Sequence, residues 1–146
     1  MNIRKAYALS NANPGDEEVA DMLRGCRTIV VVGLSDRPDR DSYRVGAYLK
    51  EKGYRIIPVN PAKSEILGEK CYPDLASISE PIDIVDIFRA VEAIPGIVDE
   101  AVKIGAGCVW MQRGLSHDES AGKARTAGLF VVQSCCIMVE HKRLLG

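Results

Sequence analysis

The sequence has no long apolar run, few aromatic residues and almost no net charge. Its apolar runs are far too short to cross a bilayer, and residues 1–7 contain no apolar core of a signal peptide. Aromatic residues make up 5% of the chain and the formal net charge is −1 at pH 7, so neither stacking nor overall positive charge favours nucleic acid. These absences predict a cytoplasmic protein that binds neither membranes nor nucleic acid.

Patterns typical of metal sites are also missing. The chain has two histidines, and its cysteines occur without Cys-x-x-Cys spacing, so a metal site has little support. Reduced and mostly buried thiols are the favoured interpretation. The adjacent pair Cys135 and Cys136 leaves a redox role open, although no neighbour in the sequence obviously activates a thiolate. The cysteines are Cys26, Cys71, Cys108, Cys135 and Cys136.

The sequence offers no convincing catalytic set. His117 lies at an expected helix start and His141 near the C-terminus, and each reads as a surface or packing residue. Asp83 and Asp86 lie three apart on an expected strand, so they point to opposite faces and make a poor acid–base couple. We expect Asp86 to orient Arg89 or to cap a backbone group.

Short apolar runs alternate with amphipathic segments along the chain. The runs at residues 28–32, 54–61, 82–88, 108–111 and 129–132 predict five strands, with helical spacing in most of the segments between them. This alternation predicts an α/β fold: a doubly wound, Rossmann-like parallel sheet with strand order 3-2-1-4-5, counted along the chain. Pro58 and Pro61 suggest that the second run is an edge strand or a strand end.

We expect residues 1–146 to form a single domain, in which residues 1–25 are an N-terminal helical brace. A chain of 146 residues matches the size of one domain. The expected brace helix begins at Asn13 and Pro14, a cap residue followed by proline, and ends at Gly25. No internal repeat or linker divides the rest.

The most informative stretch runs from residue 28 to residue 44. A β-branched strand ends at Gly33 and leads through a polar loop into a helix. Backbone N–H groups and the helix dipole favour an anion at such a junction. Arg37, Arg40 and Arg44 add charge suited to a polyanion. We interpret the stretch as a phosphate-binding loop; an ordinary corner with solvated arginines is the alternative.

The residues narrow the choice of nucleotide without settling it. The dinucleotide pattern G-x-G-x-x-G keeps its first glycine, Gly33, and a P-loop motif is absent. The second expected strand ends at Asn60 and Pro61, without the acidic residue that bonds a ribose hydroxyl, and Lys63 follows. A basic residue there suits a phosphorylated ribose, which leaves both NADP and coenzyme A (CoA) open.

Several motifs resemble one family. They are residues 31–35, 38–45, 57–61, 84–89 and 110–112, followed by Cys136-Ile137 and Glu140-His141. In this order they look like the small stand-alone CoA-binding proteins, which share the CoA-binding domain of the succinyl-CoA synthetase alpha subunit. The resemblance spans roughly residues 26–144. That family commonly shows an Asp-Arg pair where this chain has Ser134 and Cys135.

The resemblance implies a set of cofactor-binding residues. Gly33 and Ser35 would meet the diphosphate, and the residues around Pro61 would flank the adenine end. The phosphate role of Arg40, Ser42 and Arg44 is inferred from their charge and position. The full expected set is Gly33, Leu34, Ser35, Arg40, Ser42, Arg44, Val59, Asn60, Pro61, Lys63, Ile87, Phe88, Arg89, Met111, Gln112 and Arg113.

Three functions follow from this reading. The first is a non-catalytic protein that binds CoA or an acyl-CoA, with a CoA-using enzyme as a possible partner. In the synthetase, a phosphorylated histidine and grasp-type nucleotide chemistry lie outside this domain, and we expect no second domain here to supply them. The alternatives are an NADP-dependent oxidoreductase, disfavoured by the missing glycines, and a protein-interaction module with a vestigial nucleotide cleft.

Overall fold

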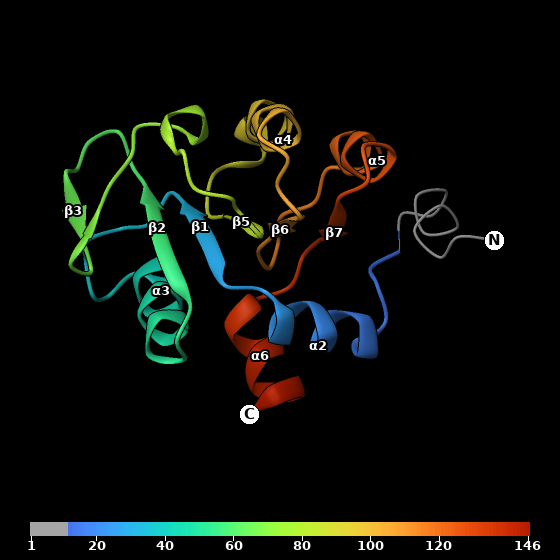
Figure 1. The fold of residues 1–146 in the computed structure, drawn as a ribbon, viewed down its shortest axis with the longest axis horizontal. Coiled ribbons are helices and arrows are strands. Elements are labelled where there is room, and N and C mark those ends of the chain that lie inside the picture. The colour runs from blue at the N-terminus through green and yellow to red at the C-terminus, as the bar shows by residue number, and fades with distance from the viewer. Residues whose placement is uncertain (1–11) are drawn as a thin grey trace.

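A computed structural model describes residues 12–146 and shows a parallel sheet between two layers of helices (Figure 1). All neighbouring strands in the sheet run parallel, in the order β2-β1-β5-β6-β7. This arrangement confirms the predicted doubly wound, Rossmann-like class. The strands are β1 (Thr28–Val32), β2 (Arg55–Val59), β5 (Ile84–Ile87), β6 (Cys108–Met111) and β7 (Phe130–Val132).

The predicted strand order is wrong in one respect. Counted along the chain the observed order is 2-1-3-4-5, so β5 lies beside β1 instead of beyond β2. The Asp83 carboxylate fixes this pairing by accepting the backbone N–H groups of Arg27 (2.8 Å) and Thr28 (2.9 Å). The outer side of β2 is occupied by Tyr72, whose N–H donates to the Pro58 carbonyl. Pro58 has no N–H of its own to offer a further strand.

Helices cover both faces of the sheet (Figure 1). One face carries α4 (Ile94–Lys103) and α5 (Asp118–Thr126), and the other carries α2 (Asp16–Gly25), α3 (Asp41–Glu51) and α6 (Ile137–Leu145). Each face buries its own apolar cluster, because strands covered on both sides alternate their side chains between two cores. Trp110 is fully buried in the second cluster, as its apolar run predicts, and donates its indole N–H to the Cys135 carbonyl.

The N-terminal brace begins later than expected. The helix starts at Asp16 with Gly15 before it, because Asn13 is used elsewhere. The Asn13 side chain donates to the Gln133 carbonyl (2.9 Å) and accepts the Gln133 N–H (2.8 Å), which ties this segment to the residue after β7. Residues 1–11 of the expected brace lie outside the described residues.

The remaining segments connect these layers. The connector after β2 forms a short antiparallel pair, β3 (Glu65–Ile66) with β4 (Glu69–Lys70), and the 3-10 helix η1 (Leu75–Ser77) begins after Asp74. A second 3-10 helix, η2 (Val91–Ala93), precedes α4. The helix α5 begins directly after His117, at the expected helix start, and the His117 ring accepts the Ser120 N–H. No helix within residues 12–146 has both the length and the apolar character needed to span a bilayer.

Candidate functional site

The loop after β1 begins with a glycine that no other residue could replace without strain. Gly33 has a φ of +88°, which L side chains rarely adopt. A Cβ at this position would collide with the backbone carbonyl oxygen of Phe88, which follows β5. The Gly33 N–H donates to the Val59 carbonyl at the end of β2 (2.9 Å). The carboxyl ends of three strands therefore converge at this one residue.

Two serines shape the loop between Gly33 and α3. The buried hydroxyl of Ser42 accepts the Ser35 N–H (3.0 Å), and the Ser35 hydroxyl accepts the Arg37 N–H (3.1 Å). The residue before α3 is Arg40, and within the described chain no side-chain hydrogen bond caps this helix end. The first-turn N–H groups of α3 are therefore left for a ligand, beside a positive helix end.

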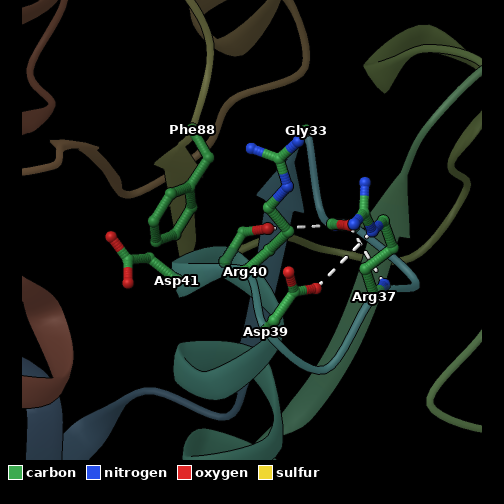
Figure 2. A pocket seen from close by; sticks show the side chains of 8 residues that line it. Gly33, Arg37, Asp39, Arg40, Asp41 and Phe88 are labelled. Atoms are coloured by element: carbon green, nitrogen blue, oxygen red, sulfur yellow. Dashed lines mark hydrogen bonds and ion pairs between the residues drawn. The ribbon is translucent and has the colours of Figure 1, made fainter.

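A first cavity of about 540 Å³ opens over this loop (Figure 2). Figure 2 shows the Arg40 side chain rising between Phe88 and Gly33, with Asp41 below the phenyl ring. The cavity is lined by Gly33, Ser35, Arg37, Asp39, Arg40, Asp41, Ser42 and Phe88. Its walls are polar on the loop side and aromatic on the β5 side, which suits a ligand with a charged group and a flat or extended apolar part.

The basic side chains at the first cavity differ in how far they are neutralised. Arg37 lies 3.5 Å from the Asp39 carboxylate, and Arg44 forms an ion pair with Asp41 one turn back in α3. Arg40 has no carboxylate within ion-pair distance in the part of the chain that the structure describes. Of the three arginines singled out in the sequence, Arg40 thus carries the positive charge most available to an anion.

A second cavity of about 520 Å³ adjoins the first at Phe88 and Asp41, which line both. It lies between the starts of α3 and α6 and the loops after β5 and β6. Its lining is Asp41, Arg44, Val45, Phe88, Arg89, Gln112, Arg113, Leu115, Cys136, Met138 and Val139. Both basic and apolar side chains line it. Because the two cavities share Phe88 and Asp41, they form one groove along the carboxyl edge of the sheet, where doubly wound folds bind ligands.

A buried carboxylate lies behind the second cavity. Asp86, in β5, is fully buried, and its Oδ1 accepts a hydrogen bond from the side-chain amide of Gln112, while Oδ2 has no hydrogen-bond partner among the residues that the structure describes. Burial raises the pKa of Asp86 to about 7, and the bond from Gln112 opposes that shift. The expectation that Asp86 orients Arg89 or caps a backbone group is therefore wrong. Its partner comes from the next strand, β6.

The structure gathers many of the expected cofactor-binding residues but not all of them. Those that line the first cavity are Gly33, Ser35, Arg40, Ser42 and Phe88. Those that line the second are Arg44, Phe88, Arg89, Gln112 and Arg113. Val59 and Pro61 line a smaller cavity of about 180 Å³ on the α4 side of the sheet, together with Arg89.

The other expected residues lie in the core or contact the loop after β1. The side chains of Leu34, Ile87 and Met111 are fully buried in the core and line none of the cavities above. Asn60 donates its side-chain amide to the Leu34 carbonyl (3.0 Å), which fixes the loop after β1 from the β2 side. Lys63 pairs with Asp36 (3.1 Å), so its charge lies beside the same loop.

Six residues of the second cavity escaped prediction as site residues: Asp41 and Val45 in the first turns of α3, and four from later in the chain. Leu115 follows β6, and Cys136, Met138 and Val139 belong to the start of α6. Helical spacing marks Met138 and Val139 as ordinary amphipathic residues. Packing of α6 against α2 and α3 brings them to the groove, and a local pattern does not report such contacts. For Cys136, its place in a family motif was the available signal.

The cysteines differ in environment. All five are free thiols, and burial raises the pKa of Cys26 to about 12 and that of Cys108 well above its ordinary range. The pKa of Cys135 is also raised, chiefly by burial. Within residues 12–146 no group of three or more His, Cys, Asp or Glu side chains is arranged to hold a metal ion.

Comparison with known proteins identifies the family. Residues 27–142 match the model of a family described as the CoA binding domain. The chain belongs to this family. It is 42% identical over 129 residues to a Bacillus subtilis protein named "Uncharacterized protein YneT", covering 88% of this chain and 96% of that protein. The resemblance noted in the sequence is thereby confirmed.

The chain is also similar to a solved structure of about its own length and to one segment of a much longer ligase. A solved structure of a hypothetical protein from Pyrococcus horikoshii superimposes with a TM-score of 0.89 at 39% identity, covering 94% of this chain and 99% of that one. An ADP-forming acetate–CoA ligase of Archaeoglobus fulgidus is 28% identical over 99 residues, which is 66% of this chain and 15% of the ligase. The chain thus corresponds to a small part of that ligase.

Proposed function

We propose that this protein binds CoA or an acyl-CoA in the groove at the carboxyl edge of its sheet, as a non-catalytic module. The observation that carries the proposal is the junction at Gly33, where an uncapped helix start and the Arg40 guanidinium face one cavity. An anion there gains backbone N–H donors and a cation together. Membership of the CoA binding domain family supports CoA as the molecule that supplies the anion.

The groove also offers room for the rest of such a ligand. With its diphosphate at Gly33 and Ser35, the adenine end of CoA would extend toward Val59, Pro61 and Lys63. The amide-bearing arm would run past Phe88 into the second cavity, whose apolar and hydrogen-bonding walls match a chain of that composition. Arg44 and Arg113 would flank the arm.

An NADP-dependent reductase is less well supported. Its diphosphate approaches a glycine-rich turn closely, but here the position two residues after Gly33 holds Ser35, which is bonded to Ser42 and Arg37. We infer a cytoplasmic protein that delivers CoA to, or takes it from, a CoA-using enzyme. The similarity to one segment of a CoA ligase supports this inference.

The test is a ligand titration of four proteins. Thermal unfolding and calorimetric titration with CoA, acetyl-CoA and NADPH are run on the wild type, Arg40→Ala, Arg44→Ala and Arg24→Ala. Arg24 is exposed in α2 and pairs with Asp21, away from the groove, so it is the matched control. CoA should raise the melting temperature of the wild type, because a ligand that binds the folded state alone stabilises it.

Arg40→Ala should weaken CoA binding by about tenfold, the usual scale of one charge-assisted hydrogen bond, while Arg24→Ala leaves it unchanged. Arg44→Ala should lose less, since Asp41 already neutralises Arg44. Added salt should reduce both losses by screening the phosphates. A melting temperature that responds to NADPH and not to CoA would favour the reductase. A protein that responds to neither would favour an interaction module.

A further inference from the structure

The neighbouring cysteines at the start of α6 face different surroundings. Cys135 lies in a small cavity beside the N-terminal segment, together with Asn13, Trp110 and Arg143. Cys136 lines the second cavity of the groove, on the other side. Both are free thiols, and they do not share a cavity. The adjacent pair in the sequence is therefore two separate sites, and Cys136 is the one that meets the proposed ligand groove.

The surroundings of Cys136 suit a reactive thiol. It is half-buried, immediately precedes α6, and makes no side-chain cap hydrogen bond within the described chain. Arg89 and Arg113 line the same cavity, together with Arg44, whose charge Asp41 balances. Reactive cysteines occupy partly exposed, electropositive positions of this kind, whereas buried structural cysteines are inert. Cys108, fully buried in β6, is an example of the inert kind in this chain.

A second observation points to a ligand at this end of the groove. The Oδ2 atom of Asp86 is buried and has no partner within residues 12–146, and Oδ1 is held by Gln112, a wall residue of the cavity that Cys136 also lines. A buried polar atom without a protein partner is usually satisfied by an ordered water or by a bound polar group. The arm of CoA carries two amide groups between its diphosphate and its thiol, so it brings polar groups of the required kind as far as Gln112.

We propose that the thiol end of CoA lies beside Cys136 and that this residue captures CoA from its disulfide as a mixed disulfide. This inference rests on the proposed function. The Cys136 thiolate attacks one sulfur of CoA disulfide and forms a new S–S bond, while the old S–S bond breaks. The second CoA leaves as a thiolate and takes up the proton that Cys136 released. The Cys136 sulfur is oxidised from thiol to disulfide and the departing CoA is reduced from disulfide to thiol, while the CoA that stays on the protein does not change its oxidation level.

Binding of the nucleotide part should make this exchange selective. Once the diphosphate is held at Gly33 and Arg40, attack by Cys136 is effectively intramolecular, and its rate rises with the effective concentration of the bound sulfur. Glutathione disulfide can undergo the same thiol–disulfide exchange, but it has no nucleotide part that the groove could hold. We therefore expect CoA disulfide to modify Cys136 at least about tenfold faster than glutathione disulfide at equal concentration.

The experiment follows adduct formation by intact-protein mass and peptide mapping. Reduced wild type, Cys136→Ser and Cys135→Ser are mixed with CoA disulfide or glutathione disulfide, with and without adenosine 3′,5′-bisphosphate as a competitor without a thiol. The wild type and Cys135→Ser should gain one CoA, mapped to Cys136 and removed by dithiothreitol. Cys136→Ser should gain none at this rate, and the competitor should slow the reaction of the wild type.

Noncovalent CoA binding is measured by calorimetry on Cys136→Ser, so the two proposals fail in different ways. If Cys136→Ser binds CoA but the wild type reacts equally fast with both disulfides, or reacts first at another cysteine, the inference about Cys136 is overturned and the proposed function stands. If Cys136→Ser does not bind CoA and the competitor has no effect on the wild type, both proposals are overturned.

Discussion

The carbonyl oxygen of Phe88 occupies the space that a side chain on Gly33 would need. The two residues follow the neighbouring strands β1 and β5, and the close approach brings the loop over β1 against the phenyl ring that both cavities share. The geometry of the candidate site therefore depends on one position without a side chain.

Gly33→Ala should lose CoA binding and unfold more easily. A φ of +88° is strained for alanine, and the added Cβ forces the Phe88 carbonyl away, so we expect a loss of about 1–3 kcal/mol or more in the free energy of unfolding. Gly53→Ala is the control, because φ is +99° there but nothing lies within 4 Å. It should lose about 1 kcal/mol and keep its CoA affinity. Urea unfolding and calorimetry measure both; equal CoA affinity in the two variants would contradict the assignment.

Ser42→Ala should weaken both the fold and the site. The Ser42 hydroxyl accepts the Ser35 N–H and is buried, so its loss leaves a donor unpaired, at a cost of about 1–3 kcal/mol. CoA affinity should fall because the loop loses its fixed shape. Ser42→Thr retains the oxygen and should restore most of both quantities. Ser77→Ala, an exposed change in η1, is the control for loss of a serine hydroxyl elsewhere. If Ser42→Ala bound CoA like the wild type, Ser42 would have no part in the site.

Asp86 should make the protein less stable as the pH rises from about 4 to 7. Burial raises its pKa from 3.8 to about 7. In that window the folded protein holds a proton that the unfolded chain has released, so the free energy of unfolding falls by roughly 1 kcal/mol per pH unit. Above pH 7 both states are ionised and the loss is complete. Asp86→Asn cannot titrate, so its stability relative to the wild type should improve between pH 5 and pH 8.

Urea unfolding at several pH values measures this difference. Asp99→Asn, an exposed change in α4, reports the effect of removing a carboxyl charge from the surface. A constant difference in stability between Asp86→Asn and the wild type across this range would show that Asp86 does not stay protonated.

His141 should lower the free energy of unfolding as the pH falls, whereas Asp86 lowers it as the pH rises. Its ring is 7% exposed, packs edge-on against Tyr48 and Tyr54, and shares a hydrogen bond with the Tyr48 hydroxyl (2.7 Å). Burial lowers the pKa of His141, and the nearby Lys52 lowers it further. The folded state therefore resists protonation, and stability is lost as the pH falls from 6.5 through the lower folded pKa. NMR titration of the imidazole, assigned with His141→Gln, should give a midpoint below 6.5. A midpoint at or above that value would refute the burial argument.

Local patterns predicted the elements well but not all of their neighbours. The apolar runs marked every strand of the sheet, and Gly33 marked the turn, because these features depend on adjacent residues. Pro58 already indicated an edge strand, and this was incompatible with the predicted order, which placed the same strand inside the sheet. The position of β5 depends on Asp83, which meets the start of β1 from 55 residues away.

In the candidate site too, the parts formed by adjacent residues could be predicted, whereas the contacts between distant residues could not. The sequence could predict that Gly33, Ser35, Arg40 and Ser42 lie around one cavity, because they belong to one continuous loop and the helix start that follows it. The bond between Asp86 and Gln112 joins two strands, and Cys136 reaches the groove through the packing of α6. Neither the Asp86–Gln112 hydrogen bond nor the position of Cys136 at the groove can be predicted from residue spacing or composition. Asn13 was wrongly predicted as a helix cap because its partner, Gln133, lies 120 residues away and leaves no local pattern near Asn13.

The bonds of Tyr72 along β2 and of Asn13 beside β7 have a consequence for assembly. At both edges of the sheet, backbone groups near the groove already form hydrogen bonds within the chain: Pro58 with Tyr72 at one edge, and Gln133 with Asn13 at the other. An incoming strand would first have to displace them, so growth by strand addition is opposed at both sides. The proposed CoA-using partner would then dock on helices and loops, without adding a strand to the sheet.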